Sequence, residues 1–256
     1  MSNESHSFFS YKIFSGKITE LQLDDFNSNK LLISTINPHS FYVADHDPLF
    51  KRSLQESHVL LPDGIGIVLA NLLINFSRIP KISGMDIFKH LLQTASNAKN
   101  LAQKKVFFLG STNENLSLIK QKIEREYPSL EIATFSPPFK EEFSEDELEC
   151  IVGRIDQFEP YILFIGMTAP RQEKWAYLNF RSVNASITCS VGAVFDFYSG
   201  RIKRPGQVWR SLGLEWLGRF LKEPRRLWRR SLISLPYFVQ CVMLEGMKKI
   251  SSSIWK

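Results

Sequence analysis

The stretch VFFLGSTNENLSLIKQKIEREY, from Val106 to Tyr127, decides the fold because it joins two structural periods. Its first residues, Val106–Leu109, form a continuous apolar run that ends in a glycine, which predicts a strand buried on both faces of a sheet. The remainder predicts a helix over Asn113–Tyr127, because its apolar side chains recur at helical spacing: Leu116, Ile119 and Ile123. A buried strand followed by an amphipathic helix is typical of a parallel α/β sheet.

Four more apolar runs repeat this pattern, and each ends in a glycine or polar turn. They are Leu31–Ile36 before Asn37, Val59–Leu61 before Pro62-Asp63-Gly64, Ile162–Ile165 before Gly166, and Ile187–Val191 before Gly192. A chain of 256 residues with 44% hydrophobic residues can bury a substantial core. The sequence therefore predicts an α/β fold with a mainly parallel, Rossmann-like sheet that carries helices on both faces.

The turns after these strands should lie along one rim, because ligands of open α/β sheets bind beyond the carboxyl ends of the strands. The turns contribute Asn37, Asp63, Gly110, Gly166 and Gly192. A glycine after a strand is common turn chemistry, so each glycine taken alone indicates only a turn. The polar side chains of Asn37 and Asp63 indicate a role with a ligand.

Asp63 is the carboxylate that stands out. Pro62 fixes the backbone before it, and Gly64 allows a sharp change of direction after it. A helix is predicted to start near Ile65, so Asp63 could be its N-cap. It could equally be a general base held on a rigid turn at the rim.

The segment from Arg78 to Asp86 offers groups that suit a diphosphate. Lys81 and Arg78 are cations, and Gly84 allows close approach to the backbone. Taken alone, the segment is more simply interpreted as a solvated loop.

The segment after Gly166 predicts another helix start, with Pro170 near position N1 and Thr168 as the cap. Free amides at such a start can receive a phosphate or a sugar hydroxyl. Gln172 and Glu173 could point to the same site, or could simply be first-turn residues that the helix dipole favours.

Several familiar sites are absent from the sequence. It contains no GxGxxG or Walker A loop, no HExxH and no GxSxG, and we expect no cofactor and no metal. Asp45-His46-Asp47 has the DxD form that many sugar transferases use for a metal, but its predicted helical location favours surface charge. The cysteines are scattered, without a CxxC pair, and the first residues, Met1 to Tyr11, lack a signal peptide. We therefore expect the protein in the cytoplasm.

Charge is distributed unevenly along the chain. The net charge is +6, yet the stretch from Gly200 to Lys256 holds 13 Lys and Arg against three Glu. The preceding residues hold 19 basic and 23 acidic side chains. This asymmetry predicts a catalytic core over residues 1–200, an appendage over residues 201–256, and a polyanionic partner for the appendage.

The appendage interleaves tryptophan with arginine at helical spacing, as in Trp209, Trp216 and Arg219, which suits the lipid headgroup region. Ser231–Leu244 is uncharged, but its 14 residues are too few to cross a bilayer core of ~30 Å. The alternatives are a core-packing helix with a basic face and a nucleic-acid-binding segment. A large tryptophan-rich apolar side, without a nucleic-acid-binding module, favours binding on a membrane surface and no nucleic acid.

Nine short motifs occur in a fixed order between about Leu31 and Leu232. They are Thr35-Ile36-Asn37; Pro62-Asp63-Gly64-Ile65-Gly66; Gly84-Met85-Asp86; Phe108-Leu109-Gly110; Gly166-Met167-Thr168-Ala169-Pro170-Arg171-Gln172-Glu173; Val191 to Gly200; Arg204-Pro205; Gly213-Leu214-Glu215-Trp216; and Glu223-Pro224-Arg225-Arg226. Each motif is weak by itself, but the ordered set is specific. It resembles the WecG/TagA/CpsF family, glycosyltransferase family 26.

This resemblance implies an inverting transfer from a UDP-sugar to a sugar on undecaprenyl diphosphate in bacterial polysaccharide biosynthesis, without a metal. It implies that Asp63 is the general base and that Thr35, Asn37 and Gln172 line the substrate pocket. Basic residues of the appendage are implied to meet the diphosphate; the matches are Arg219, Arg225 and Arg226. We add Gly64, Lys81, Gly84, Asp86, Gly110, Gly166 and Gly192 as candidate substrate-binding residues. The predicted location is the inner face of the cytoplasmic membrane.

One position departs from the family pattern. Many members carry an arginine three residues before the Gly-x-Asp glycine, where this chain has Lys81. Lysine keeps the charge but lacks the fork by which arginine binds a phosphate through two parallel hydrogen bonds.

The sequence leaves the donor open among N-acetylmannosamine, its uronic acid, glucose and another hexose. It also leaves open the acceptor sugar and the oligomeric state, a homo-oligomer included. Two other classes remain: a nucleotide-sugar-modifying enzyme, which should show the missing glycine fingerprint, and a non-catalytic membrane- or nucleic-acid-binding adaptor.

Overall fold

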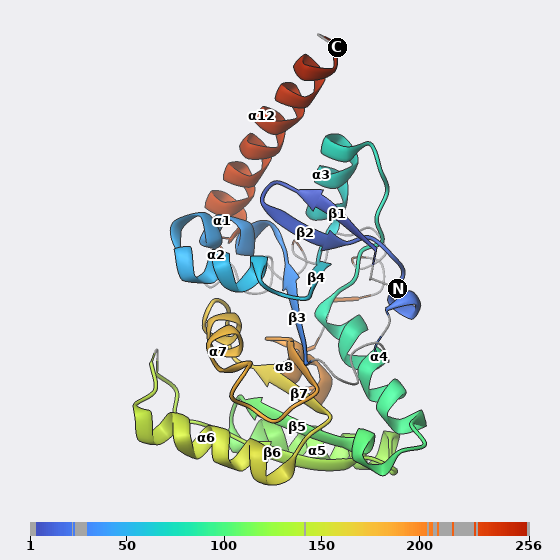
Figure 1. Ribbon diagram of the computed structural model, residues 1–256, viewed down its shortest axis with the longest axis vertical. Coiled ribbons are helices and arrows are strands. Elements are labelled where there is room, and N and C mark those ends of the chain that lie inside the picture. Colours follow the sequence, from blue (N-terminus) through green and yellow to red (C-terminus); the bar gives the residue numbers. More distant parts are fainter. Residues whose placement is uncertain are drawn as a thin grey trace.

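The computed structural model describes residues 4–21, 23, 30–140, 142–203, 205–206, 209, 217, 228 and 230–254. Its centre is a six-stranded sheet with the order β4-β3-β8-β7-β5-β6, in which every neighbouring pair is parallel (Figure 1). The strands are β3 (Leu31–Ile36), β4 (Val59–Pro62), β5 (Lys105–Gly110), β6 (Glu131–Phe135), β7 (Ile162–Gly166) and β8 (Ile187–Ser190). The predicted α/β fold with a parallel sheet is confirmed.

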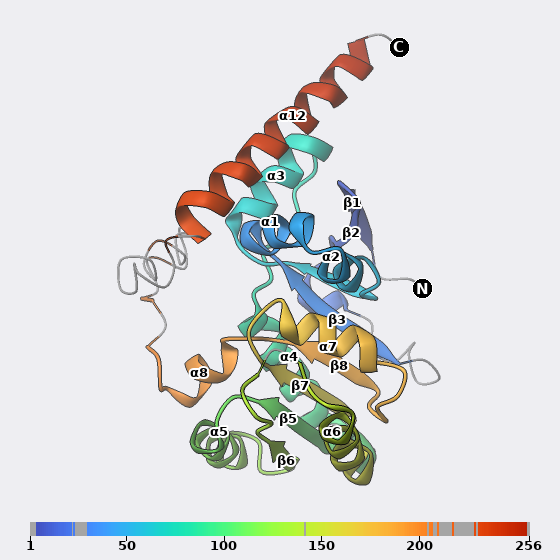
Figure 2. The same ribbon diagram turned by 90° about the vertical axis from the view of Figure 1, so that its left-hand side faces the viewer.

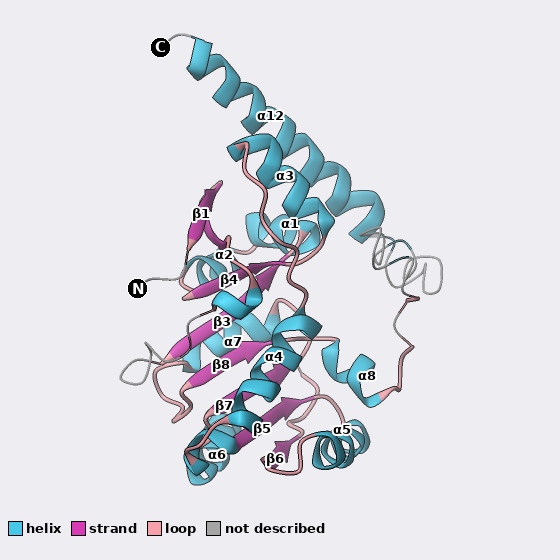
Figure 3. Cartoon of the chain, turned by 90° about the vertical axis from the view of Figure 1, so that its right-hand side faces the viewer, coloured by secondary structure: helices cyan, strands magenta, loops and turns pink. Residues whose placement is uncertain are grey.

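Helices cover both faces of the sheet. They are α1 (Pro38–His46), α2 (Pro48–Gln55), α3 (Ile65–Asn75), α4 (Gly84–Asn97), α5 (Asn113–Glu126), α6 (Glu145–Phe158), α7 (Arg171–Asn179) and α8 (Val194–Ser199). Two short 3-10 helices are η1 (Ile18–Glu20) and η3 (Leu101–Lys104). Helices α4, α5 and α8 share one buried cluster with the sheet, whereas α6 and α7 share another on the opposite face (Figure 3).

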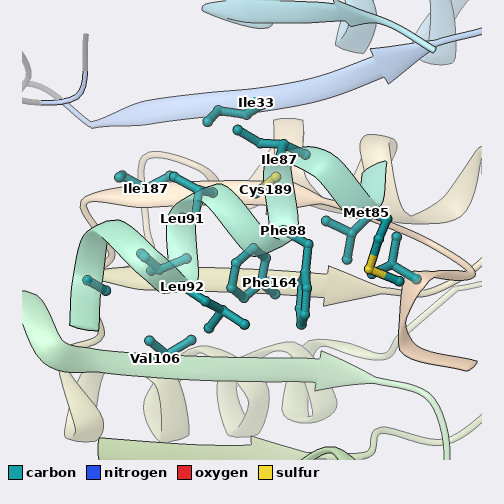
Figure 4. Close-up of a cluster of buried hydrophobic side chains, with 14 of the residues drawn as sticks. Ile33, Met85, Ile87, Phe88, Leu91, Leu92, Val106, Phe164, Ile187 and Cys189 are labelled. Atoms are coloured by element: carbon teal, nitrogen blue, oxygen red, sulfur yellow. The ribbon is translucent and has the colours of Figure 1, made fainter. Parts of the chain in front are cut away.

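Helix α4 fills the first of these clusters. Its Phe88 is fully buried against Phe164 of β7, with ring centroids 4.7 Å apart, and Leu92 points toward Val106 of β5 (Figure 4). Burying a large apolar side chain contributes roughly 1.5–3 kcal/mol. The helix is therefore held firmly across the strands, and its first turn lies where those strands end.

The sequence did not predict three strands. An antiparallel hairpin, β1 (Ser5–Phe8) and β2 (Tyr11–Phe14), packs beside β4, and β6 forms the edge of the main sheet. The hairpin turn contains Phe9 and Ser10, without the glycine or asparagine that usually marks such turns.

The C-terminal part that is described consists of a π-helical turn, η4 (Arg230–Ser234), and the long helix α12 (Leu235–Ile254). Phe238 and Val242 of α12 are buried in a third cluster, with the hairpin and helices α1, α2 and α3. Helix α12 runs beside α3 and projects beyond the rest of the molecule (Figure 2). No helix among the described residues is long and apolar enough to cross a bilayer.

Candidate functional site

The strand ends align along one rim of the sheet. In the pairing register, Thr35 lies opposite Leu61, Ile36 opposite Pro62, and Gly110 opposite Gly166. The turns that follow these strands are therefore neighbours, as expected for a ligand site at the carboxyl ends of parallel strands.

Asp63 follows β4 at this rim, and its side chain is partly buried. Its backbone N–H donates to the carbonyl oxygen of Ile36 at 2.9 Å, which ties the turn to β3. Helix α3 begins at Ile65 with Gly64 as its N-cap, and no side chain caps it. The alternative that Asp63 is the N-cap residue of this helix is therefore wrong.

Asn37 follows β3 and has a structural task. Its Oδ1 accepts from the backbone N–H groups of His39 and Ser40, each at 3.0 Å, and so caps α1. These two bonds occupy the acceptor Oδ1, so a ligand would meet Asn37 through its Nδ2 donor. Thr35 lies two residues earlier and is partly buried.

The segment before α4 is drawn to the same rim. The N–H of Ile82 donates to the carbonyl oxygen of Pro62 at 3.0 Å, which fixes Ile82 at the end of β4. Lys81 is the residue directly before Ile82. A Cβ on Gly84 would lie 3.4 Å from the carbonyl oxygen of Val191, which places the start of α4 beside the end of β8.

Asp86 has a structural role. One of its carboxylate oxygens accepts from the N–H of Ser83 at 2.8 Å and from the Ser83 hydroxyl at 2.7 Å. This is a capping box at the start of α4. A role for Asp86 toward substrate remains a prediction.

Gln172 and Glu173 lie in the first turn of α7, and both side chains are almost completely buried. The Gln172 Nε2 donates to Glu173 Oε1 at 2.7 Å. Burial raises the pKa of the Glu173 carboxyl to about 7, while the hydrogen bond from Gln172 opposes that shift. Gln172 Oε1 and Glu173 Oε2 are buried acceptors without a hydrogen-bond partner in the part of the chain that is described.

Gly192 brings the chain after β8 against Gln172. It adopts a φ of +57°, and a Cβ there would lie 3.3 Å from Gln172 Nε2. A side chain at this position would be strained and would press on the amide of Gln172. The interpretation of Gln172 and Glu173 as mere first-turn polar residues does not account for their burial or for this close approach.

The start of α7 differs from the prediction in one respect. Thr168 does not cap the helix: Pro170 occupies the N-cap position, and the helix begins at Arg171. The carbonyl oxygen of Thr168, rather than its hydroxyl, accepts from the N–H of Gln172 at 3.4 Å. The proline therefore sits one position earlier than expected.

Gly110 and Gly166 are explained by packing. A Cβ on Gly166 would lie 2.1 Å from the Phe195 ring, and a Cβ on Gly110 would lie 2.8 Å from the Gly166 carbonyl oxygen. Distances under 3 Å require the neighbour to move. A direct contact of either residue with substrate remains a prediction.

The remaining candidates divide into two groups. Arg219, Arg225 and Arg226 lie outside the described residues. The DxD segment carries surface ion pairs: Asp45 binds Lys51 at 2.9 Å, and Asp47 caps α2 and binds Lys174 at 2.7 Å. In the part of the chain that is described, no group of three or more His, Cys, Asp or Glu is arranged to hold a metal.

Sequence reasoning missed a buried polar group on the β5 side of the rim. Asn115 of α5 donates through Nδ2 to the Ser111 hydroxyl at 2.8 Å and to Asp196 Oδ1 at 3.0 Å. The only signal in the sequence was an asparagine four residues before Ile119, on the face of α5 that is otherwise apolar. This network links the turn after β5 to α8.

Taken together, the candidate groups at the rim are the Asp63 carboxylate, the amides of Asn37 and Gln172, and the cation of Lys81. These groups suit a ligand that has both hydroxyl and phosphate groups. Amides and carboxylates form hydrogen bonds with hydroxyl groups, and cations balance the charge of a phosphate.

Comparison with known proteins agrees with this chemistry. Residues 12–252 match the sequence model of the family described as Glycosyl transferase WecG/TagA/CpsF. The chain is 31% identical over 219 residues to an N-acetylglucosaminyldiphosphoundecaprenol N-acetyl-beta-D-mannosaminyltransferase of Bacillus subtilis (strain 168), covering 85% of this chain and 81% of that protein. Enzymes of the same name from Bacillus spizizenii and Staphylococcus aureus (strain MW2) are 30% and 27% identical, over 88% and 83% of this chain and 84% and 80% of their own lengths.

Proposed function

Because the chain belongs to the WecG/TagA/CpsF family of glycosyltransferases, we propose that it transfers a sugar from a UDP-sugar to a saccharide on polyprenyl diphosphate. The single observation that supports this best is the position of Asp63. Asp63 follows β4 at the rim, its backbone N–H is bonded to the end of β3, and Gly64 rather than Asp63 is the N-cap residue of α3.

The donor proposed first is UDP-N-acetylmannosamine, with N-acetylglucosaminyl diphosphoundecaprenol as the acceptor. The named relatives transfer an N-acetylmannosaminyl group to that lipid. The uronic acid of N-acetylmannosamine, glucose and another hexose are the donors to test next.

In the proposed reaction the acceptor hydroxyl attacks the anomeric carbon on the face opposite UDP. The new bond joins the hydroxyl oxygen to that carbon, the bond from the carbon to the diphosphate oxygen breaks, and UDP leaves with the electron pair. Asp63 takes the hydroxyl proton, which is the role of a general base. The configuration at the anomeric carbon is inverted.

Gln172 is proposed to read a hydroxyl or N–H group of the substrate. The Gln172 Nε2 donates to Glu173, so the amide oxygen Oε1 points away from Glu173. Among the described residues this oxygen has no hydrogen-bond donor. A substrate donor satisfies that buried oxygen, which is otherwise costly to leave unpaired. Glu173 is then a positioning residue that fixes which atom of the amide is presented.

Positive charge for the departing diphosphate is proposed to come from Lys81 and from the appendage arginines, Arg219, Arg225 and Arg226. Preorganised cations stabilise a developing phosphate charge in a site that excludes water. This arrangement calls for no metal.

The proposed location is the inner face of the cytoplasmic membrane, where a polyprenyl-linked acceptor is available. The core over residues 1–200 holds the rim, and the basic appendage over residues 201–256 attaches the protein to anionic lipid.

The test is UDP release by the full-length protein bound to vesicles that contain the lipid-linked N-acetylglucosamine acceptor. We expect acceptor-dependent release with one donor of a panel of UDP-sugars. Release without acceptor would indicate a hydrolase, and no release with any donor and acceptor pair would reject the proposal.

A further inference from the structure

Large apolar side chains are exposed mainly at one end of the molecule. Helix α3 exposes Leu69, Leu73 and Phe76, at 51%, 57% and 74% of their surfaces. Helix α12 exposes Val239, Met243 and Met247, at 50%, 59% and 56%. Leu232 and Ile233 of η4, directly before α12, and Leu244 of α12 are exposed as well. Elsewhere in the part of the chain that is described, exposed leucines such as Leu101, Leu118 and Leu178 stand singly on separate elements. Single exposed residues are ordinary, whereas a contiguous patch marks an interaction surface.

The two helices are fixed side by side at both ends. Near their starts, a Cβ on Gly66 would lie 3.8 Å from the Phe238 ring. Near their ends, Lys249 Nζ donates to Asn75 Oδ1 at 2.7 Å. Helices α3 and α12 therefore run in the same direction, as all three views show (Figures 1–3).

The exposed side chains of the two helices face the same way. Leu69 and Leu73 follow Gly66 by three and seven residues, so they lie on the face of α3 that borders α12. On α12, Tyr237 contacts Tyr42 of α1, Phe238 is buried, and each further residue advances about 100° around the axis. Val239 consequently lies on the side of α12 away from α1, beside α3. We call these six exposed residues of α3 and α12 the apolar face.

Charge around the apolar face is positive. Arg78 follows Phe76 by two residues, and the chain from Gly64 to Pro80 contains no acidic residue. Helix α12 contains Lys248 and Lys249 against Glu245. An apolar face bordered by cations fits a bilayer surface with anionic headgroups.

Phe76 supports a binding role for this face. It is the C-cap of α3 and adopts a left-handed conformation, φ 51°, where glycine is the usual residue. A bulky side chain in that conformation costs free energy. The exposed ring thus occupies a position that stability alone would give to glycine.

We propose that α3 and α12 together form a membrane-docking face, so that the catalytic core itself rests on an anionic bilayer. This inference rests on the proposed function for its choice of lipid as partner. Helix α3 starts directly after Asp63-Gly64, and its 11 residues span about 16 Å. Docking of Phe76 therefore holds the catalytic turn within one helix length of the lipid that carries the acceptor.

The experiment measures sedimentation of the full-length protein with phosphatidylglycerol–phosphatidylcholine vesicles. The double variant Leu69→Gln/Leu73→Gln should bind roughly tenfold more weakly than wild type, because two partly exposed leucines lose their apolar contact with lipid. The matched control, Leu118→Gln/Leu178→Gln, changes exposed leucines of α5 and α7 and should bind like wild type. Vesicle binding that is equal in both double variants would overturn the proposal.

A second variant removes any doubt about folding. Phe76→Gly should bind vesicles several-fold more weakly while its unfolding temperature stays equal or rises, since glycine suits the left-handed cap. Unchanged binding would overturn the role of α3. A sedimentation coefficient that rises with protein concentration in the absence of vesicles would indicate self-association. If the Leu69→Gln/Leu73→Gln variant lost that rise, the face would instead be assigned to a second copy of the chain.

A water-soluble, short-chain acceptor separates this inference from the proposed function. With it, UDP release should be the same in wild type and in the Leu69→Gln/Leu73→Gln variant. If no protein releases UDP, the proposed function fails, yet the vesicle comparison still decides whether α3 docks.

Discussion

The units β4–α3 and β5–α5 share one plan, a buried parallel strand, a short turn at the rim and a helix, but they use their side chains differently. In β5–α5 the turn residue Thr112 caps the helix, accepting from the N–H of Asn115 at 3.3 Å. The outer face of α5 is charged and carries the pairs Lys120–Glu124 and Lys122–Glu126. The helix start of this unit is capped within the unit, and its charged outer face suits contact with water.

The β4–α3 unit departs from that plan at both ends. Asp63 does not cap its helix, and the outer face of α3 presents leucine and phenylalanine. A carboxylate at the rim that is not the helix cap, and an apolar helix face that is exposed, both depart from local sequence rules, and such departures mark candidates for function. The comparison teaches that one unit holds the fold, while the other keeps a carboxylate for chemistry and an apolar face for a partner.

The largest expected effect tests the turn of β4–α3. Asp63→Asn should lower the rate of UDP release by about 10²–10⁴-fold, because an amide cannot accept the hydroxyl proton. Binding of UDP, measured by calorimetry, should persist. The control is Asp47→Asn, the same change at an aspartate that caps α2. Wild-type turnover in Asp63→Asn would remove the distinction between the two turns.

A third unit, β7–α7, sharpens the comparison, because Glu173 should make the free energy of unfolding depend on pH. Burial raises its folded-state pKa from 4.5 to about 7, so the native state holds the proton more tightly than the unfolded chain. This contribution is fully present below pH 4.5 and is lost as the pH rises toward 7. Relative to wild type, Glu173→Gln should therefore gain about 3 kcal/mol in unfolding free energy between pH 4.5 and pH 8.

Urea unfolding at pH 4.5, 6 and 8 measures this difference. Glu126→Gln is the control, since Glu126 accepts from the Tyr198 hydroxyl at 2.6 Å but its side chain is 43% exposed. A pH-independent difference between Glu173→Gln and wild type would show that Glu173 is not a buried titrating group.

A smaller effect is expected in the turn of β5–α5. Thr112→Ala should lower the unfolding free energy by about 1 kcal/mol, because the first turn of α5 loses its cap. Thr112→Ser keeps the hydroxyl and should restore most of the loss. The same unfolding free energy in wild type, Thr112→Ala and Thr112→Ser would mean that the Thr112 side chain does not stabilise the start of α5. The two turns would then not differ in this respect.

The smallest effect concerns metal. UDP release should be unchanged in EDTA, because the proposed charge on the leaving diphosphate is balanced by Lys81 and the appendage arginines. Loss of activity that only Mn²⁺ restores would assign that task to a metal and would weaken the interpretation of the rim as a site made of protein groups alone.

The sequence predicted the sheet well where strands are buried on both faces. Five apolar runs marked five of its six strands, and the helix after β5 ended within one residue of its predicted end. Strand β6 escaped because it lies at the sheet edge and is only half buried, so Glu131 and Thr134 interrupt any apolar run. The hairpin escaped because Phe9 adopts a positive φ without a glycine to signal it.

The sequence predicted where the site residues lie better than it predicted which residues they contact. The turns with Asn37, Asp63 and Lys81 do share one rim. The packing around Gln172 could not be read from its neighbours in sequence, because Gly192, which follows β8, approaches its amide closely. The cap of α7 was misplaced because the proline takes the N-cap position itself.

The burial of Phe238 has a consequence for the order of synthesis. Its ring lies 6.4 Å from Phe8 and 5.3 Å from Phe41, so three segments from distant parts of the chain complete one cluster. A ribosome makes Phe8 and Phe41 long before Phe238, and contacts of such separation form slowly. The cluster that holds α3 therefore cannot be completed until the last part of the chain has been synthesised.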